Sequence, residues 1–342
     1  MIIRELTVHF VTPAFLGNAG QSGQWRTPPF KHLLREWWRV AWAEANRYSS
    51  DVNKMRREEA RLFGAAADET GRRALIRLRL SRWDTGKEQS WRQDLKVRHP
   101  EVGKGGALVG SQLYLGYGPL AYDKNSKGTK LKANAAIQAG EEAQLKLACP
   151  ASDSALIDRA LALADAFGTL GGRARNGWGS LSLTGDMASS SGQQLPLRTW
   201  QDCLDREWAH AIGEDEQGAL IWRTDPVSDW AGLMKTLAEI KIGLRTQFVF
   251  HSGKGASHPE ERHWLSYPVT NHSVRPWGGN RLPNTLRFKV RKDDQGRFYG
   301  VIFHMPCLPP EQFEPNRQTV ERVWQQVHQY LGGRKNLHRS DW

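Results

Sequence analysis

Hydrophobic and polar residues alternate from the first residues of the chain. Over residues 2–11, Leu6, Val8 and Phe10 lie on one side, with polar residues between them. A period of two is typical of a strand with one buried face. The sequence therefore predicts a first strand at 2–11.

The pattern changes after the Gly-rich stretch FLGNAGQSGQW. Thr27 can cap a helix that has Pro28 in its first position. Apolar side chains then recur at helical spacing, at Phe30, Leu33, Leu34, Trp37 and Ala41. We expect a helix here, with Trp37 and Trp38 in the core.

Four further elements follow up to residue 184. We expect strands at 74–80, 144–149 and 181–184, and before the last of them a helix capped by Ser152 or Asp153 that ends at Gly168. The resulting order, β-α-β-β-α-β, is that of the ferredoxin-like split βαβ plan. We place the first domain at 1–184.

A long basic insertion, 84–142, separates the second and third strands. Segments of this length without structure of their own are usually functional or disordered, and both possibilities stay open. The segment 185–198 contains the Ser-, Gly- and Gln-rich GDMASSSGQQLP and reads as an interdomain linker.

The second half, 199–342, has a weaker pattern. Helices are expected at 199–213, 228–239 and 317–331, and strands at 242–250, 285–291 and 298–305. A long loop fills 251–283. The fold class predicted for the whole chain is α+β, with two ferredoxin-like domains of the RNA-recognition type, long insertions, and a degenerate second domain.

Composition narrows the class of protein. A chain of 342 residues with 39% hydrophobic residues and 15 tryptophans can form two buried cores. Its net charge of +12 favours a polyanionic partner, nucleic acid first, although an inert basic surface would give the same number.

Other function classes find no support in the sequence. Three distant cysteines form no CxxC element, and no apolar run approaches the length of a membrane span or a signal peptide, so we expect a cytoplasmic protein away from the membrane. The histidines at 251, 258, 263 and 272 lack zinc-site spacing. We expect neither metal nor cofactor.

The residues best suited to bind a phosphate or a base are concentrated in the Gly-rich loop 168–180, which contains GGRARNGWGS. Arg173 and Arg175 are forked donors suited to phosphate oxygens, and Trp178 offers a face for a base. The loop leads from a helix into a strand, opposite to nucleotide-triphosphate loops. The alternative is a turn with incidental arginines and a core tryptophan.

Basic residues also follow the first helix. Lys31, Arg35 and Arg39 recur at intervals of four, and Arg26 and Thr27 precede them at a helix N-terminus that favours anions. A solvated face, paired with Glu36, is the alternative. His32 could act as a base in metal-independent RNA cleavage, although no partner residue is evident.

Together these stretches resemble a known family. VTPAFLGNAGQSGQWRTPPFKHLLREWWRV, EARLFGAA and GGRARNGWGS are similar to the RAMP superfamily of CRISPR RNA-binding proteins, and most similar to the two-domain first subunit of type III-B Cmr effector complexes. RHWLSYPV and RLPNTLRFKV resemble the second domain of that subunit.

The resemblance implies a non-catalytic subunit that holds the 3′ part of the guide RNA (crRNA), helps admit target RNA in antiviral defence, and contacts other RAMP subunits. Its RNA-contacting loop maps onto 171–179, and its basic helix segment onto Arg26, Thr27, Lys31 and Arg35. RNA cleavage belongs to other subunits of such complexes.

The leading hypothesis is therefore an RNA-binding groove between two domains. Its predicted contacts are Arg26, Thr27, Lys31, Arg35, Arg39, Lys127, Lys130, Gly172, Arg173, Arg175, Asn176, Trp178 and Arg281. Two alternatives stay open: a metal-independent endoribonuclease that processes guide RNA through His32, and a module that mainly binds proteins.

Overall fold

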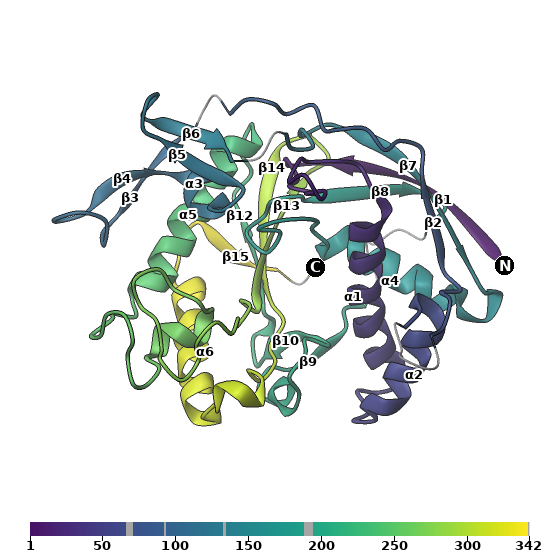
Figure 1. Ribbon diagram of the computed structural model, residues 1–342. Helices are drawn as coiled ribbons and strands as arrows, with labels where there is room; N and C mark the ends of the chain where they lie inside the picture. Colours follow the sequence, from purple (N-terminus) through teal and green to yellow (C-terminus); the bar gives the residue numbers. More distant parts are fainter. Residues whose placement is uncertain (66–70, 92–93, 133–134, 188–193, 341) are drawn as a thin grey trace.

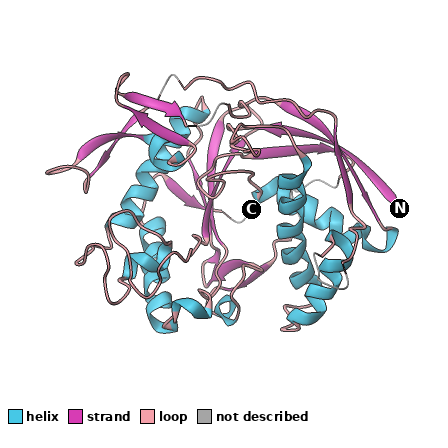
Figure 2. Cartoon of the chain, viewed as in Figure 1, coloured by secondary structure: helices cyan, strands magenta, loops and turns pink. Residues whose placement is uncertain are grey.

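The computed structural model describes residues 1–65, 71–91, 94–132, 135–187, 194–340 and 342. The chain has a mixed α+β fold with several antiparallel sheets, which confirms the α+β part of the predicted fold class (Figures 1 and 2). Within the described residues, no helix combines the length and the apolar character needed to cross a membrane.

The first half is built on a four-stranded sheet. Its strand order is β2-β7-β1-β8, and neighbouring strands are antiparallel. Two strand–helix–strand units interleave in it, as in the split βαβ plan. The elements are β1 (Ile2–Phe10), α1 (Thr27–Ala45), β2 (Arg77–Leu80), β7 (Glu142–Cys149), α4 (Ser154–Phe167) and β8 (Leu181–Gly185).

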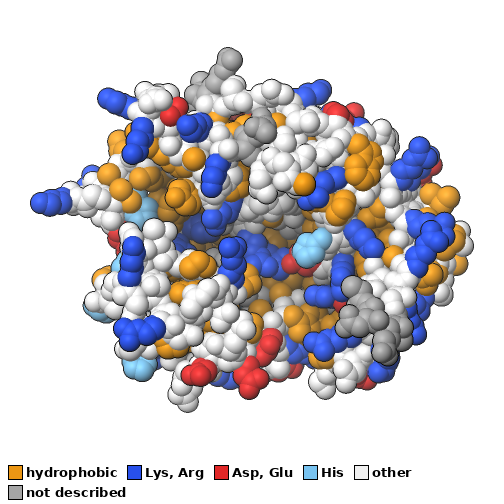
Figure 3. Space-filling model, in the orientation of Figure 1, with side chains coloured by type: hydrophobic (Ala, Val, Ile, Leu, Met, Phe, Trp, Pro, Cys, Tyr) orange, Lys and Arg blue, Asp and Glu red, His pale blue; other side chains and the backbone are white. Residues whose placement is uncertain are grey.

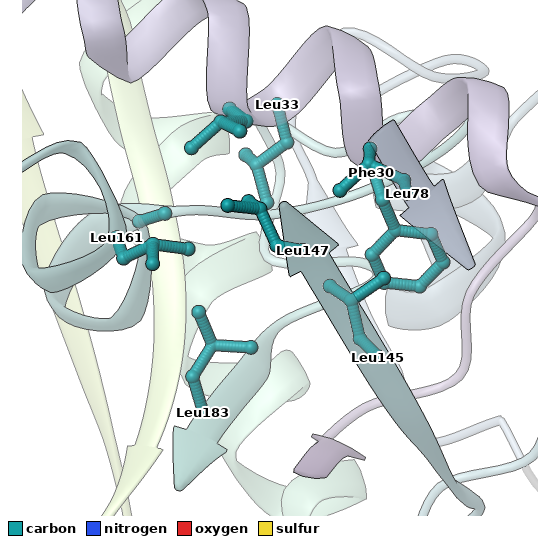
Figure 4. Close-up of a pocket in the computed structure, with 9 residues that line it drawn as sticks. Phe30, Leu33, Leu78, Leu145, Leu147, Leu161 and Leu183 are labelled. Carbon is teal, nitrogen blue, oxygen red and sulfur yellow. The ribbon is translucent and has the colours of Figure 1, made fainter. Parts of the chain in front are cut away.

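Helices α1 and α4 pack on one face of this sheet. Phe30 and Leu33 of α1 meet Leu145 and Leu147 of β7 around a small cavity (Figure 4). Every side chain that lines this cavity is apolar. We therefore read it as packing space rather than a ligand site.

The start of α1 differs from the prediction. Arg26 is the N-cap residue, and its side chain makes no capping hydrogen bond, while Thr27 is already helical. Two prolines, Pro28 and Pro29, fix the first turn instead. A further helix that the sequence did not predict, α2 (Val52–Phe63), packs on α1.

The insertion 84–142 contains its own elements, and only 92–93 and 133–134 lie outside the described residues. Asp94 accepts hydrogen bonds from the backbone of Gln112 and Leu113 and from Thr129 Oγ1, so it holds three segments together. The elements are β3 (Lys96–His99), β4 (Ala107–Gly110), α3 (Ser111–Gly116), β5 (Leu120–Asp123) and β6 (Gly128–Leu131).

Residues 188–193 of the proposed linker lie outside the described residues. After them comes a small sheet of β9 (Leu197–Thr199), β10 (Ile212–Asp215) and β11 (Gly218–Ala219). The helix predicted at 199–213 is wrong. Its apolar residues, such as Cys203 and Leu204, reach the core from a short 3₁₀ turn.

The second half has a four-stranded sheet of the same design. Its order, β13-β14-β12-β15, repeats the relation between sequence and space seen in the first sheet. The elements are β12 (Ile221–Thr224), α5 (Trp230–Thr246), β13 (Leu286–Lys292), β14 (Phe298–His304), α6 (Arg317–Gly332) and β15 (Leu337–Arg339).

The strand predicted at 242–250 is wrong, because 242–246 belong to α5. That helix buries Leu233, Leu237, Ile240 and Ile242, so apolar residues lie on several of its sides and obscure the helical period. The helices predicted at 228–239 and 317–331 and the strands at 285–291 and 298–305 are confirmed.

The two halves meet where the Gly-rich loop and β8 approach β13. The Phe288 N–H donates to the Arg175 carbonyl at 3.1 Å, and the Val290 N–H donates to Ser180 Oγ at 2.8 Å. Phe167 and Phe303 pack across the boundary with ring centroids 4.9 Å apart. We call this junction the seam.

Cations of β13 strengthen the seam. Lys289 is 1% exposed and donates to the carbonyls of Ala164 and Asp165 at the end of α4. Arg291 donates to the Ala166 carbonyl at 3.2 Å. The cationic side of β13 is therefore packed against the first half.

Candidate nucleic-acid interface

Glycines let the Gly-rich loop lie directly against other backbone. At Gly179, with φ +61°, a Cβ would be 1.9 Å from the Leu170 carbonyl oxygen. At Gly171, with φ +91°, it would be 2.7 Å from the Phe15 carbonyl oxygen. A side chain at either position would clash, so these glycines serve the packing of the loop on its own chain.

The tryptophan and the asparagine of the loop are buried. Trp178 is 0% exposed and packs against Phe15 and Trp91, so its predicted role in base stacking is wrong in this conformation. Asn176 donates to the Leu115 carbonyl at 2.6 Å and accepts from Lys241. Because Asn176 is buried, its predicted contact with a base edge is wrong in this conformation. Gly172 donates its N–H to the Phe15 carbonyl.

Arg175 lies between the two halves, beside an ion pair. Arg287 of β13 is 8% exposed and pairs with Glu36 of α1 at 2.6 Å. Burial would raise the pKa of Glu36, but Arg287 and Arg175 outweigh it and hold that pKa below its ordinary value. Within the described residues, the Arg175 guanidinium has no hydrogen-bond or ion-pair partner.

The surroundings of Arg175 favour a bound anion. Burial, reinforced by Arg287, lowers the pKa of Arg175 to about 10, so the guanidinium is still charged at neutral pH. A half-buried charge without a partner is costly, and an anion relieves that cost. Burial also raises the pKa of the neighbouring Cys307 to about 11, which keeps its thiol protonated.

More cations continue from Arg175 toward α5. Burial, followed by the charge of Arg281, lowers the pKa of Arg173. Burial, followed by Arg245 and Arg173, lowers the pKa of Lys241 well below its usual range. We define the cationic row as Arg173, Arg175, Lys241, Arg245, Arg281 and Arg287.

The surface is hollowed where these elements meet. Figure 3 shows a depression at the centre of one face in which Lys and Arg side chains gather. Helix α1 lies on one side of this region and α5 on the other (Figure 1). Because like charges repel, such a gathering favours the binding of a polyanion.

The basic segment of α1 is only partly available. Arg35 and Arg39 both donate to the buried carboxylate of Glu59 on α2, so their charges are already paired within the fold, and their role in binding stays a prediction. Lys31 is half-buried and, among the described residues, has no ion-pair partner. His32 is exposed beside Glu36.

The remaining predicted contacts lie apart from one another. Arg26 and Thr27 are half-buried at the start of α1. Lys127 and Lys130 are exposed on the hairpin of β5 and β6, where Lys130 pairs with Asp123 at 3.3 Å. The structure thus brings Arg173, Arg175 and Arg281 together, whereas no contact joins Lys127 or Lys130 to them in the described part of the chain.

Sequence reasoning missed Lys241, Arg245 and Arg287. The spacing of four between Lys241 and Arg245 was the available signal, but it carries meaning only on a helix, and a strand was predicted there. Among the described residues, no group of three or more His, Cys, Asp or Glu side chains could hold a metal ion. His272, for example, stacks on Phe250 with centroids 4.0 Å apart.

Comparison with protein families identifies the chain. The model of the RAMP superfamily matches residues 7–182, just over half of the chain. The chain belongs to the RAMP superfamily. The match covers α1, β2, β7, α4 and the Gly-rich loop of this RAMP protein, together with parts of β1 and β8. No curated protein sequence matches it significantly.

Solved structures resemble this RAMP protein over almost its full length. One is Cmr1 from Pyrococcus furiosus in its apo form, with 14% identity, 96% of this chain and 97% of that chain covered, and a TM-score of 0.43. Another is a chain in the type III-B Cmr-beta complex bound to cognate target RNA, with 10% identity, 95% and 99% covered, and a TM-score of 0.48.

Proposed function

We propose that this RAMP protein is a non-catalytic, cytoplasmic RNA-binding subunit of a type III-B CRISPR effector complex. It holds the 3′ part of the guide RNA, helps admit target RNA in antiviral defence, and contacts other RAMP subunits of the Cmr complex. Membership of the superfamily and the motifs of 11–40 and 171–180 support this proposal. Two ferredoxin-like domains agree with the repeated strand order.

The observation that carries the proposal is the cationic row, with Arg175 at its centre. Six cations come from the loop, α5, β13 and the segment around Arg281, and Glu36 is the carboxylate paired directly with one of them. An arginine guanidinium can donate two parallel hydrogen bonds to the oxygens of one phosphate group. A ribose–phosphate backbone therefore fits this row better than a single small anion does.

The test is RNA binding by the variant Arg173→Ala/Arg175→Ala over a salt series. We expect affinity for single-stranded RNA to fall about tenfold or more, and the slope of log K against log salt to become about 1.4 less steep, since each phosphate contributes about 0.7. Within the described residues, neither side chain makes a hydrogen bond, so the variant should remain folded.

Arg56→Ala/Arg57→Ala is the matched control. Both arginines are exposed on α2 and lack partners among the described residues, so the variant loses the same charge at another place. Equal affinity of the two double variants at every salt concentration would refute the role of the cationic row.

Copurification distinguishes a guide-RNA subunit from a general RNA binder. RNA bound to the protein in its own cells should be of guide length and share a common tag. A random mixture of cellular RNA would contradict the assignment to the effector complex, although not RNA binding itself.

The non-catalytic assignment has its own test. Purified protein incubated with repeat RNA in EDTA should leave the RNA intact. Defined fragments that disappear in His32→Ala would instead support the endoribonuclease alternative, because His32 is exposed next to Glu36 at the margin of the hollow.

A further inference from the structure

One tryptophan differs from all the others. The chain has 15 tryptophans, every one of them among the described residues, and Trp83 is the one that is exposed, at 54%. It follows β2, the strand at the outer side of the first sheet. A single exposed aromatic residue is common on protein surfaces and does not by itself indicate a binding site. The residues around Trp83 therefore have to be considered.

The residues before Trp83 alternate in exposure. Arg77, Arg79, Ser81 and Trp83 are exposed, whereas the residues between them are buried or half-buried. Pairing with β7 continues to Ser81, whose N–H donates to the Gln144 carbonyl at 2.9 Å. Arg77 and Arg79 lie on the same face of β2, about 6.6 Å apart, and Ser81 and Trp83 follow in the bend and loop after the strand. We call these four exposed residues the row.

The two arginines in this row are free. Within the described part of the chain, neither Arg77 nor Arg79 has an ion-pair or hydrogen-bond partner. The carboxylates nearby are occupied, because Arg82 binds Asp84 and Lys146 binds Glu5 at 2.6 Å. This stretch of surface therefore carries two positive charges that no nearby carboxylate in the described ranges neutralises.

This row is distinct from the hollow. Strand β2 lies at one edge of the sheet order β2-β7-β1-β8, and β8 at the other edge adjoins the seam and the cationic row. Figure 1 shows β2 on the opposite side of α1 from β13.

We propose that Arg77, Arg79 and Trp83 form a second binding site for single-stranded RNA, in which a base stacks on the indole and phosphates bind the two arginines. Stacking on an exposed aromatic side chain beside cations is how proteins hold single strands without reading sequence. The choice of RNA over DNA rests on the proposed function, but the stacking and the phosphate contacts do not.

A protein partner fits this surface less well. Interfaces between proteins bury an apolar centre around their aromatic and arginine contacts. Here the neighbours of Ser81 on the open face of the sheet are polar: Ser81, Gln144 and Thr7 form a hydrogen-bonded group, with Gln144 Nε2 donating to Thr7 Oγ1 at 2.9 Å. Ile3, beside the Ala148 that pairs with Arg77, is a single exposed apolar side chain at the other end of this face.

Photocrosslinking tests the site directly. The full chain is irradiated with single-stranded RNA that contains 4-thiouridine, and the crosslinked peptides are identified after trypsin digestion. We expect a crosslink in the peptide of residues 83–87, both in the native protein and in Arg173→Ala/Arg175→Ala. Crosslinks confined to other peptides would overturn the proposal. A crosslink at 83–87 that persists when the hollow no longer binds separates this site from the proposed function.

Affinity measurements supply a second test. Trp83→Ala should weaken RNA binding about fivefold or more with an unchanged salt slope, since stacking is not ionic. Arg77→Ala/Arg79→Ala should reduce the slope by about 1.4. All three positions are exposed, so the variants should keep the thermal stability of the native protein.

The controls are Tyr122→Ala, which removes an aromatic ring 52% exposed on β5, and Lys254→Ala/Lys335→Ala, which removes two exposed charges. Losses equal to those of the controls would overturn the site. Equal binding of single-stranded DNA would overturn its assignment to RNA. Weaker association of Trp83→Ala with other subunits at unchanged RNA affinity would point to a protein contact instead.

Discussion

At the scale of single residues, Glu36 is the most informative side chain of the hollow. It is a carboxylate among cations, it pairs with Arg287 across the seam, and it lies close enough to Arg175 to influence its pKa. It thus has two opposite effects: it stabilises the fold by neutralising Arg287, and it repels the phosphates that the row would bind.

Replacing Glu36 separates the two effects. Glu36→Gln keeps a hydrogen-bond acceptor for Arg287 but removes a negative charge. We expect Kd for RNA to decrease by about fivefold at low salt, which corresponds to roughly 1 kcal/mol, and the difference to shrink as salt increases.

The control is Glu239→Gln, which removes an exposed carboxylate from α5. Chemical denaturation of each variant checks that the fold persists. If Glu36→Gln bound RNA no better than Glu239→Gln, phosphates would not approach this carboxylate.

At the scale of elements, the sequence correctly predicted the helices and strands that bury only one face, because their apolar residues recur with a clear period. Strand β1 alternates cleanly, and α4 begins and ends close to where its caps place it. Helix α5 was mistaken in part for a strand because it is covered on several sides. The contact of Lys289 with the end of α4 could not be predicted, because its partners are more than 120 residues away along the chain.

The candidate site shows the same division. Gly171 and Gly179 marked a place where backbone comes close, but the sequence did not show whether the neighbour was a ligand or the chain itself. Arg173 and Arg175 were found because they stand in a conspicuous motif. Arg287 and Glu36 face each other only because the two halves pack together, and no local pattern contains that information.

Lys289 allows a test of the seam. In Lys289→Met the volume is nearly conserved, but the carbonyls of Ala164 and Asp165 lose a buried donor. We expect the free energy of unfolding to fall by about 1–3 kcal/mol. Lys292→Met, at an exposed position of the same strand, should change it by less than about 0.5 kcal/mol. An increase in the stability of Lys289→Met would mean that burying the amine costs more than its hydrogen bonds return.

At the scale of the whole molecule, buried neutral histidines make the fold sensitive to acid. His304 Nδ1 and His328 Nε2 are 2.9 Å apart in the second core, and His210 is fully buried near Trp208. Burial lowers the pKa of His328 to about 3 and that of His210 to about 4, and it lowers the pKa of His304 in the same direction.

This arrangement predicts a loss of stability on acidification. The unfolded chain takes up protons at these histidines below about pH 6.5, while the folded chain does so only at much lower pH, so the free energy of unfolding falls as pH decreases from 6.5 toward 4. At pH 5 the loss is on the order of 2 kcal/mol for each of His210 and His328.

Urea unfolding at pH 7 and at pH 5 measures this difference. His328→Gln should reduce it, whereas His9→Gln, at an ion pair on the open face of the first sheet, should leave it nearly unchanged. Equal free energies of unfolding at the two pH values would show that the buried imidazoles gain protons without penalty.

The seam has a consequence for how a ligand is received. Backbone hydrogen bonds, the Glu36–Arg287 pair and aromatic packing all cross it, so the walls of the hollow are held at a fixed separation before any RNA arrives. Binding to such a preorganised surface costs little conformational entropy in the protein. The conformational entropy lost on binding is then lost almost entirely by the single-stranded RNA.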